Sequence, residues 1–191
     1  LPIFAFLFAQ AHHPALARIA PIRKALGRRT IFNLTGPLAN PASVTRQLVG
    51  VPHPRLIALY RDAMALLGTE AALVVSGEEG LDEISIAGTT YLGGVGLDGL
   101  ETEIRPERAG LISHPLGDLR GGDAAYNAAA LLRLLDGEAG AYRDAVLLNA
   151  AGALIVAGQV EDWLEGVEEA REAIDKGLAK ALLACWIDTV K

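Results

Sequence analysis

Two adjacent acids, Asp82 and Glu83, are the first residues whose type and position suggest chemistry. They lie in a glycine-bounded loop directly after an apolar run (residues 73–76), and open α/β sheets bind ligands at the carboxyl ends of their strands. Neighbouring side chains of an extended segment point to opposite sides, so each acid could serve a different metal ion, or one could bridge two. Mg²⁺ prefers one or two carboxylates, waters and substrate phosphates. The alternative is a solvated surface pair, for which Glu78 and Glu79 are the comparison.

A basic cluster near the start of the chain suggests a site for an anion. Arg23 and Lys24 lie on a helix expected to begin at Pro14, and Arg28 and Arg29 follow that helix. A guanidinium offers a planar fork that matches a carboxylate in two parallel hydrogen bonds, so Arg23 could hold an acidic small molecule. The alternative stays open that it is a surface charge or the partner of a carboxylate of the protein itself.

The spacing of the histidines does not predict a zinc site. His12 and His13 have no partner at metal-ligand spacing, and His53 and His114 each precede a proline. His13 is a candidate for lining a pocket or for capping the helix that follows it. The lone Cys185 falls on the apolar face of the last predicted helix, so we expect it to fill the core rather than to react. A single cysteine also excludes an internal disulfide.

Residues 94–99 spell G-x-G-x-x-G, the pattern of a dinucleotide-binding turn. That fingerprint requires a strand before it and a helix after it, whereas residues 101–104 alternate in polarity and Pro106 follows. We therefore expect a hairpin or a bulged turn. The sequence contains neither a G-x-S-x-G motif nor a P-loop, which argues against nucleophile-elbow hydrolases and P-loop nucleotidases.

The composition indicates one well-packed domain. Of the 191 residues 51% are hydrophobic and 21% charged, which is enough to fill a substantial core and too apolar for general disorder. The longest apolar stretch, residues 145–158, is shorter than the ~20 residues of a membrane-spanning helix. The net charge of −6 argues against a nucleic-acid-binding protein, which usually has a basic face. The apolar first residues lack the basic segment of a signal peptide, so we expect the chain to begin within a longer protein.

Apolar periodicity predicts an alternation of helices and strands. The predicted helices are residues 14–27, 54–67, 124–135, 144–156 and a terminal pair over 163–185. The predicted strands are 46–51, a buried strand at 71–76 and short antiparallel strands between 84 and 104, while 30–42 is expected to be a loop. On the second helix the apolar face comprises Leu56, Ile57, Tyr60, Met64 and Leu67. The alternation indicates an α/β fold, a layered sheet flanked by helices.

Six segments, taken in order, resemble the anthranilate phosphoribosyltransferase family. They are residues 12–16 (HHPAL), 20–24 (APIRK), 29–41 (RTIFNLTGPLANP), 80–85 (GLDEIS), 119–128 (LRGGDAAYNA) and 147–151 (LLNAA). The resemblance implies that residues 1–191 are the C-terminal part of an α/β catalytic domain of the nucleoside phosphorylase/phosphoribosyltransferase type. It also implies a small helical N-terminal domain, and a first part of the α/β domain, outside this sequence.

The same resemblance implies an activity: transfer of the phosphoribosyl group of phosphoribosyl pyrophosphate (PRPP) to anthranilate, in tryptophan biosynthesis in the cytoplasm. Mg²⁺ is the implied cofactor, held by Asp82 and Glu83 against the diphosphate. Arg23 would bind the anthranilate carboxylate, His13 would line the anthranilate entrance, and Asn33 would shape the pocket wall. The implied partners are PRPP, anthranilate and a second subunit in a homodimer, and neither nucleic acid nor a membrane.

One further expectation follows from the family pattern. The family's glycine-rich GTGGD loop and KHGN segment, which cradle the diphosphate and the ribose, precede the matched region and do not occur in this sequence, so we expect these 191 residues alone to be inactive. Two other interpretations stay open. One is a related pyrimidine nucleoside phosphorylase-type enzyme, against which Arg23 and the Asp82 loop argue, and the other is a non-catalytic relative that binds nucleic acid.

Overall fold

The computed structural model describes residues 4–5, 7, 12, 19, 21–22, 24–27, 31 and 34–190. These residues fall into two compact units, one extending to Val44 and a larger one from Thr45 to Thr189. In the first unit, Lys24 is part of a helical turn that ends at Gly27, as predicted. Gly27 has a left-handed φ of 59°. A short 3-10 helix, η2 (Gly36–Leu38), interrupts the predicted loop.

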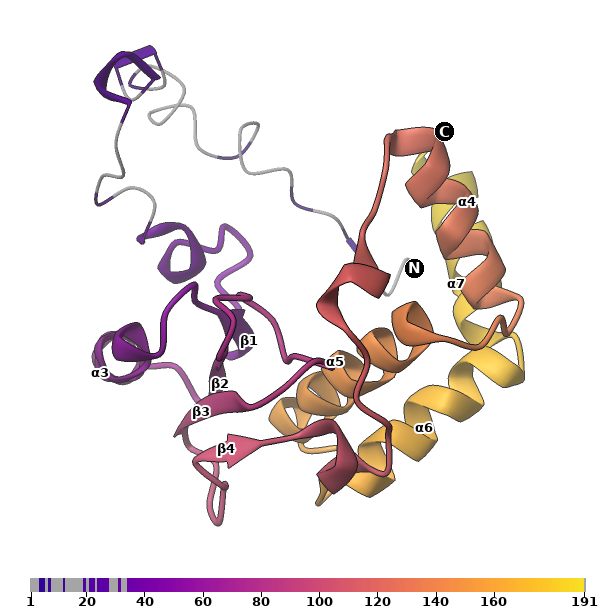
Figure 1. Ribbon diagram of the computed structural model, residues 1–191. Helices are drawn as coiled ribbons and strands as arrows, with labels where there is room; N and C mark the ends of the chain where they lie inside the picture. Colours follow the sequence, from indigo (N-terminus) through magenta and orange to yellow (C-terminus); the bar gives the residue numbers. More distant parts are fainter. Residues whose placement is uncertain are drawn as a thin grey trace. The chain divides into compact units, whose positions relative to one another are not determined.

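The larger unit contains a four-stranded sheet in the order β1-β2-β3-β4. Its strands are β1 (Arg46–Gly50), β2 (Ala71–Gly77), β3 (Thr90–Val95) and β4 (Glu103–Ile104). β1 pairs with β2 in parallel, whereas β2 with β3 and β3 with β4 are antiparallel. The sheet and the helices around it (Figure 1) confirm the α/β fold class and the antiparallel strands expected after residue 84.

Helices cover both faces of β2, which is why all seven of its residues are buried. Leu73 joins a core shared with α5 (Ala141–Ala157) and α6 (Trp163–Asp175). The next residue, Val74, points to the opposite face because side chains alternate along a strand. There its β3 partner Gly93 lies beneath α3 (Ile57–Leu66): a Cβ at Gly93 would be 2.3 Å from the Ile57 side chain. A strand that is buried on both faces needs apolar residues at successive positions, which explains the continuous apolar run in the sequence.

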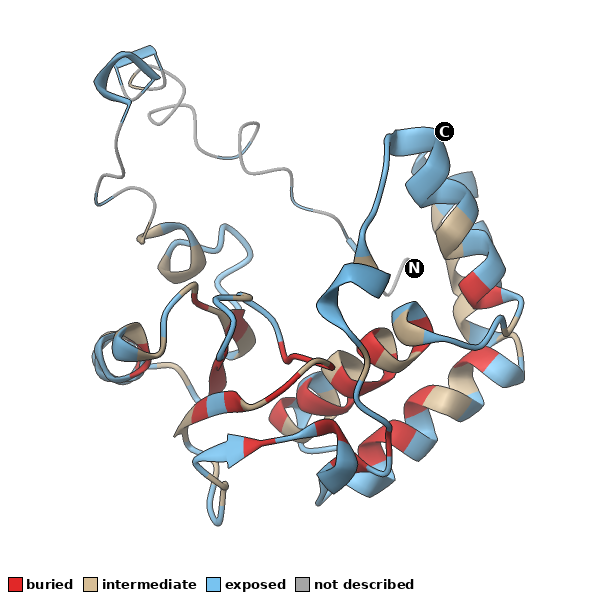
Figure 2. Ribbon diagram, viewed as in Figure 1, coloured by how far each residue is buried: buried red, intermediate tan, exposed pale blue. Residues whose placement is uncertain are grey.

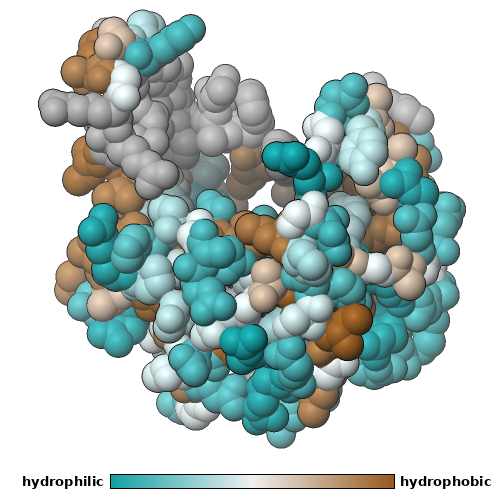
Figure 3. All heavy atoms as spheres, viewed as in Figure 1, coloured by the Kyte–Doolittle hydropathy of each residue, from teal (hydrophilic) through white to brown (hydrophobic). Residues whose placement is uncertain are grey.

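Of the remaining helices, the one that leads into α3 lies on the α3 side of the sheet, and the others extend the layer next to α5 and α6. They are η3 (Pro54–Leu56), η4 (Pro106–Ala109), η5 (Leu116–Leu119), α4 (Ala124–Leu135) and α7 (Leu178–Val190). Buried residues concentrate on β2, α5 and α6, whereas α4 and α7 are exposed over most of their length (Figure 2). The face drawn in Figure 3 is largely hydrophilic over the larger unit, with separate hydrophobic patches. Among the described residues, no helix combines the length and the apolar character needed to cross a membrane.

Two sequence expectations about burial were wrong. Leu67 is 66% exposed, because α3 ends at Leu66 and the chain leaves the sheet there. Cys185 is exposed rather than part of the core. It lies on α7, where no residue is fully buried, because only part of that helix packs against the core of α5 and α6. Periodicity identified the buried face of α3 and of α6, but on α7 it could not show which apolar residues are covered.

The glycine-rich residues 94–99 span the end of β3 and the first part of the turn that leads to β4, as predicted, and not the start of a helix. Gly96 and Gly99 both have left-handed φ angles, of 61° and 69°. At Gly96 a side chain is also excluded by contact, since a Cβ there would lie 2.0 Å from the Glu70 carbonyl oxygen. The glycines are therefore explained by the backbone conformation of the hairpin and not by the binding of a dinucleotide.

Candidate metal-binding site

The loop that carries the two candidate acids begins with a tight turn at the carboxyl end of β2. The Gly77 amide donates to the Leu81 carbonyl oxygen at 2.8 Å, and the Gly80 amide donates to the Gly77 carbonyl oxygen at 3.0 Å. Gly80 has a φ of 88°, a left-handed conformation that glycine adopts without strain. The turn reverses the chain, so that Asp82 and Glu83 come next to the end of the buried strand, as the sequence predicted.

The other two acids of this loop are engaged within it. Glu78 pairs with Thr89 twice: its amide donates to the Thr89 carbonyl oxygen at 2.9 Å, and its Oε1 accepts from the Thr89 amide at 3.0 Å. Glu79 accepts a hydrogen bond from the hydroxyl of the buried Ser85. The comparison made from the sequence, in which both were solvated surface charges, was therefore incomplete, because both carboxylates hold the loop closed.

Asp82 and Glu83 differ from their two neighbours in having no such partner. Both are exposed, and neither carboxylate forms a hydrogen bond or an ion pair with any residue of the described ranges. We call these two residues the acidic dyad. A solvent-facing pair of carboxylates on a closed loop is free to bind a cation, whereas Glu78 and Glu79 would have to give up hydrogen bonds to do so.

The main chain of the acidic dyad is fixed from both sides. On the amino-terminal side, Asp82 lies against Gly50 at the end of β1: a Cβ built on Gly50 would be 1.5 Å from the Asp82 carbonyl oxygen. On the carboxyl-terminal side, the Ile84 amide donates to Oδ1 of Asn149 on α5 at 2.9 Å. The short exposed segment is thus held between a strand and a helix.

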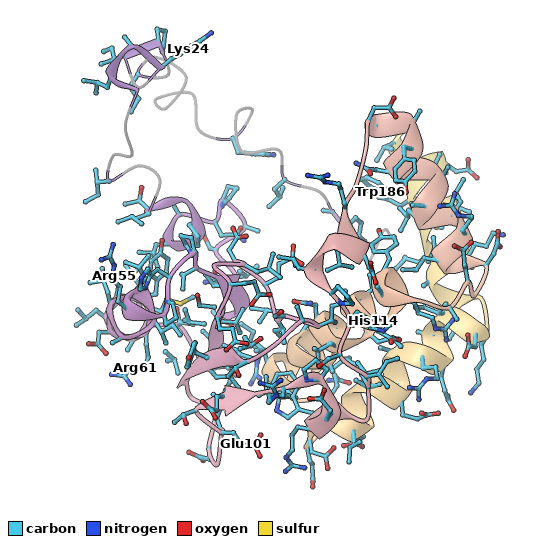
Figure 4. All side chains as sticks on the ribbon, in the orientation of Figure 1. Lys24, Arg55, Arg61, Glu101, His114 and Trp186 are labelled. Carbon is cyan, nitrogen blue, oxygen red and sulfur yellow. The ribbon has the colours of Figure 1, made fainter. Side chains whose placement is uncertain are left out.

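A second link joins α5 to the segment that follows the dyad. Nε2 of His114 lies 2.8 Å from Oδ2 of Asp144, and both side chains are largely buried. The His114 amide donates to the Ile86 carbonyl oxygen at 2.9 Å, so the pair ties α5 to the chain two residues beyond Ile84. Figure 4 shows His114 on the chain segment that passes α5.

The two carboxylates of the acidic dyad fit Mg²⁺ if the phosphates of a substrate supply further ligands. No group of three or more His, Cys, Asp or Glu side chains able to hold a metal is present in the part of the chain that the structure describes. Two carboxylates are a usual protein contribution for Mg²⁺, because this ion keeps several waters and takes the rest of its ligands from substrate phosphates. The acidic dyad is therefore suited to a metal that arrives with a phosphorylated substrate, and not to a structural metal.

A pocket of about 480 Å³ lies elsewhere, between the η5–α4 segment and the start of α5. Its lining includes Arg120, Tyr126, Arg133, Tyr142 and Arg143. Two of the guanidiniums are already paired, Arg133 with Glu138 at 3.0 Å and Arg143 with Asp175 at 2.6 Å. The pocket does not include the acidic dyad, so it carries no part of the candidate metal site.

The other predicted site residues, Arg23, His13 and Asn33, lie outside the described residues, so the structure does not place them. Sequence reasoning missed the residues that support the dyad. Asn149 had a visible signal, an amide in the middle of an apolar helix. Gly50 had none, since a glycine at the end of a strand has many explanations.

Comparison with known proteins agrees with the resemblance of the six segments. The anthranilate phosphoribosyltransferase of Sphingopyxis alaskensis is 62% identical over 183 residues, which are 95% of this chain and 55% of that protein. The enzyme of the same name from Novosphingobium aromaticivorans is 61% identical over 185 residues, 95% of this chain and 56% of the relative.

Solved structures of the same name share the fold. The crystal structure of anthranilate phosphoribosyltransferase from Thermus thermophilus matches with a TM-score of 0.90 and 42% identity, over 97% of this chain and 55% of that one. The Saccharomyces cerevisiae enzyme in complex with PRPP and Mg matches with a TM-score of 0.85 and 32% identity, over 93% and 52% of the two chains.

The chain thus spans about half the length of the curated relatives it matches. A family match covers nearly all of it: residues 3–180 correspond to the glycosyl transferase family, a/b domain. With the α/β sheet and the acidic loop at the carboxyl end of β2, this match shows that the chain belongs to the glycosyl transferase family and represents its a/b domain.

Proposed function

We propose that the protein containing this chain transfers the phosphoribosyl group of PRPP to the amino group of anthranilate, giving N-(5-phosphoribosyl)anthranilate and pyrophosphate. The observation that carries the proposal is the acidic dyad: of the four acids in its loop, only Asp82 and Glu83 are exposed without a described partner. The names of the relatives support it, including that of the yeast enzyme in complex with PRPP and Mg.

The roles of the residues follow from the charges in this reaction. The bond from the anomeric carbon of the ribose to the diphosphate breaks, a bond to the anthranilate nitrogen forms, and the amine loses a proton to the solvent. Mg²⁺ bound with PRPP would stabilise the negative charge of the leaving diphosphate. Asp82 and Glu83 would hold that ion, and through it the diphosphate. An aromatic amine attacks as the neutral species, so the chain need not supply a strong general base.

Three residues outside the described ranges complete the proposal, on the resemblance of their segments alone. Arg23 binds the anthranilate carboxylate in two parallel hydrogen bonds and orients the amine. His13 lines the entrance for anthranilate, and Asn33 forms part of the pocket wall. The phosphate-cradling segments of the family do not occur in this sequence, so the isolated 191 residues should not turn over PRPP. The full-length protein is proposed to be a cytoplasmic homodimer.

The metal assignment is tested in the full-length protein with Asp82→Asn and Glu83→Gln. Each variant should lower kcat/KM for PRPP by roughly 100-fold or more, the scale expected when a preorganised contact to a developing charge is removed. The matched control is Asp98→Asn, which neutralises an exposed acid in the glycine-bounded turn between β3 and β4. Unchanged PRPP kinetics in the two dyad variants would refute the metal site.

The substrate assignment is tested separately with Arg23→Ala. The KM for anthranilate should rise roughly 10- to 100-fold, because a charged hydrogen-bonding partner of the carboxylate is lost. Arg55→Ala is the matched control, since Arg55 is an exposed guanidinium of η3 (Figure 4). An unaltered KM for anthranilate would refute the proposed contact between Arg23 and the anthranilate carboxylate. Phosphorolysis of a pyrimidine nucleoside in place of the anthranilate reaction would favour the related phosphorylase.

A further inference from the structure

Asn149 makes contacts that an amide at the interior of a helix rarely makes. Its Nδ2 donates to the Ile84 carbonyl oxygen at 2.9 Å and to the Ala145 carbonyl oxygen at 3.0 Å, while its Oδ1 accepts from the Ile84 amide at 2.9 Å. Both main-chain groups of Ile84 are thus bonded to one side chain. This is the pairing that a neighbouring strand would provide, supplied instead by a helix.

Within the described ranges, neither of these two main-chain groups has another hydrogen-bond partner. Ile84 is 1% exposed, and the flanking residue Ser85 is equally buried. The helix approaches closely here as well: a Cβ on Gly152, three residues after Asn149, would lie 2.5 Å from the Ile84 Cδ1 atom. A buried amide and carbonyl left unpaired are costly, so Ile84 stays where Asn149 holds it.

Ile84 directly follows the acidic dyad, so the contact with Asn149 also restrains the main chain of the dyad. With Gly50 against the Asp82 carbonyl and Asn149 on Ile84, the main chain on each side of Glu83 is fixed, although Glu83 itself is exposed. The two carboxylates bind one ion well only if they keep their relative positions. Groups that orient metal ligands typically contribute 10- to 100-fold in metal affinity.

We propose that Asn149 is a positioning residue for the metal-binding dyad, which it orients through the main chain of Ile84 without touching the metal or the substrate. The inference rests on the proposed function, because it assigns Asn149 a part in the metal site of Asp82 and Glu83. It adds a residue on α5, 65 positions away from Ile84 in the sequence, to that site.

The test uses the full-length protein with Asn149→Ala and Asn149→Asp. The alanine removes all three hydrogen bonds, whereas the aspartate keeps the size and the acceptor for the Ile84 amide but loses the donors. Mn²⁺ is titrated in the presence of PRPP, and free Mn²⁺ is measured by electron paramagnetic resonance. The Mn²⁺ dissociation constant should rise roughly 10- to 100-fold in both variants. The Mg²⁺ concentration for half-maximal rate should rise in parallel, with the KM for anthranilate unchanged.

The control is Val156→Ala, which removes buried apolar volume from the same helix without touching the loop. It should lower stability and leave Mn²⁺ binding as in the wild type. If the Asn149 variants bind Mn²⁺ as Val156→Ala does, while Asp82→Asn and Glu83→Gln lose it, the positioning role is overturned and the proposed function stands. If the dyad variants themselves keep wild-type Mn²⁺ binding, the metal site of the proposed function is wrong, and the positioning role fails with it.

Discussion

Gly50 and Asp82 are in main-chain contact, although they belong to different elements. A Cβ on Gly50 would lie 1.5 Å from the Asp82 carbonyl oxygen and 2.4 Å from its carbonyl carbon. Both atoms are backbone, so no side-chain rotation can relieve the overlap. Every residue other than glycine at position 50 therefore has to displace either the end of β1 or the loop that carries the acidic dyad.

Gly50→Ala should consequently impair both stability and metal binding. We expect the free energy of unfolding in urea to fall by about 1–3 kcal/mol or more, as for overpacking of a dense interior. The Mg²⁺ requirement of the full-length protein should rise at the same time. Gly117→Ala is the control, because a Cβ there meets nothing within 4 Å. Equal stabilities and Mg²⁺ requirements for the two variants would contradict the contact.

Ser85→Ala should destabilise the loop that carries the acidic dyad. The Ser85 hydroxyl donates to Glu79, and its Oγ accepts from the Ala87 amide at 3.0 Å, so the substitution removes both bonds in a buried setting. A loss of about 1–2 kcal/mol of unfolding free energy is expected. Ser113→Ala removes an exposed hydroxyl bond to Glu107 and should stay within about 0.5 kcal/mol of the wild type. Comparable losses in the two variants would show that Ser85 does not organise the loop.

Gly166→Ala should disturb the packing of α6 on α5, away from the dyad. A Cβ on Gly166 would lie 2.8 Å from the Ala151 Cβ and 2.9 Å from the Ala151 Cα. Overpacking by about 1–3 kcal/mol should outweigh the helix-propensity gain of up to about 1 kcal/mol. The double variant with Ala151→Gly should recover part of the loss, since one of the two contacts disappears. A thermally stabilised Gly166→Ala protein would contradict the close helix contact.

Glu70 should make stability depend on acid pH. The Arg46 guanidinium, which hydrogen-bonds the Glu70 carboxylate, holds the pKa of that carboxyl below its usual value of 4.5. A group with a lowered pKa in the folded state stabilises above its unfolded pKa, and this contribution is lost as the pH falls through the lowered value. The difference in melting temperature between wild type and Glu70→Gln should therefore vanish in acid. Because both side chains are exposed, added salt should reduce it. An NMR titration that gives Glu70 a pKa of 4.5 or higher would contradict this.

The sequence predicted those features that depend on nearby residues. The apolar run of β2 identified a strand buried on both faces, and the spacing of Ile57, Tyr60 and Met64 identified the inner side of α3. The position of Asp82 and Glu83 at the end of β2 followed from chain order alone. Each of these inferences needs only local periodicity and the rule that ligands meet the carboxyl ends of strands.

Features that join distant parts of the chain could not be predicted in this way. The bond from Asn149 to Ile84 spans 65 positions, and the contact of Gly50 with Asp82 depends on which strand neighbours β2. The exposure of Cys185 could not be predicted for the same reason, because the sequence does not show which element, if any, packs against an apolar helix face. The difference between the exposed pair and its neighbours Glu78 and Glu79 also required the loop in three dimensions.

β1 pairs with β2 and with no other strand of the described residues. The amide of Val51 donates to Val75 of β2, and successive amides along a strand point in opposite directions, so the amide of Val49 also faces β2 while that of Leu48 faces outward. In deuterium oxide the Leu48 amide should then exchange much faster than that of Val49. Slow exchange at both positions would reveal that another stretch of backbone has docked along this border, and these two amides thus report on the assembly of the sheet.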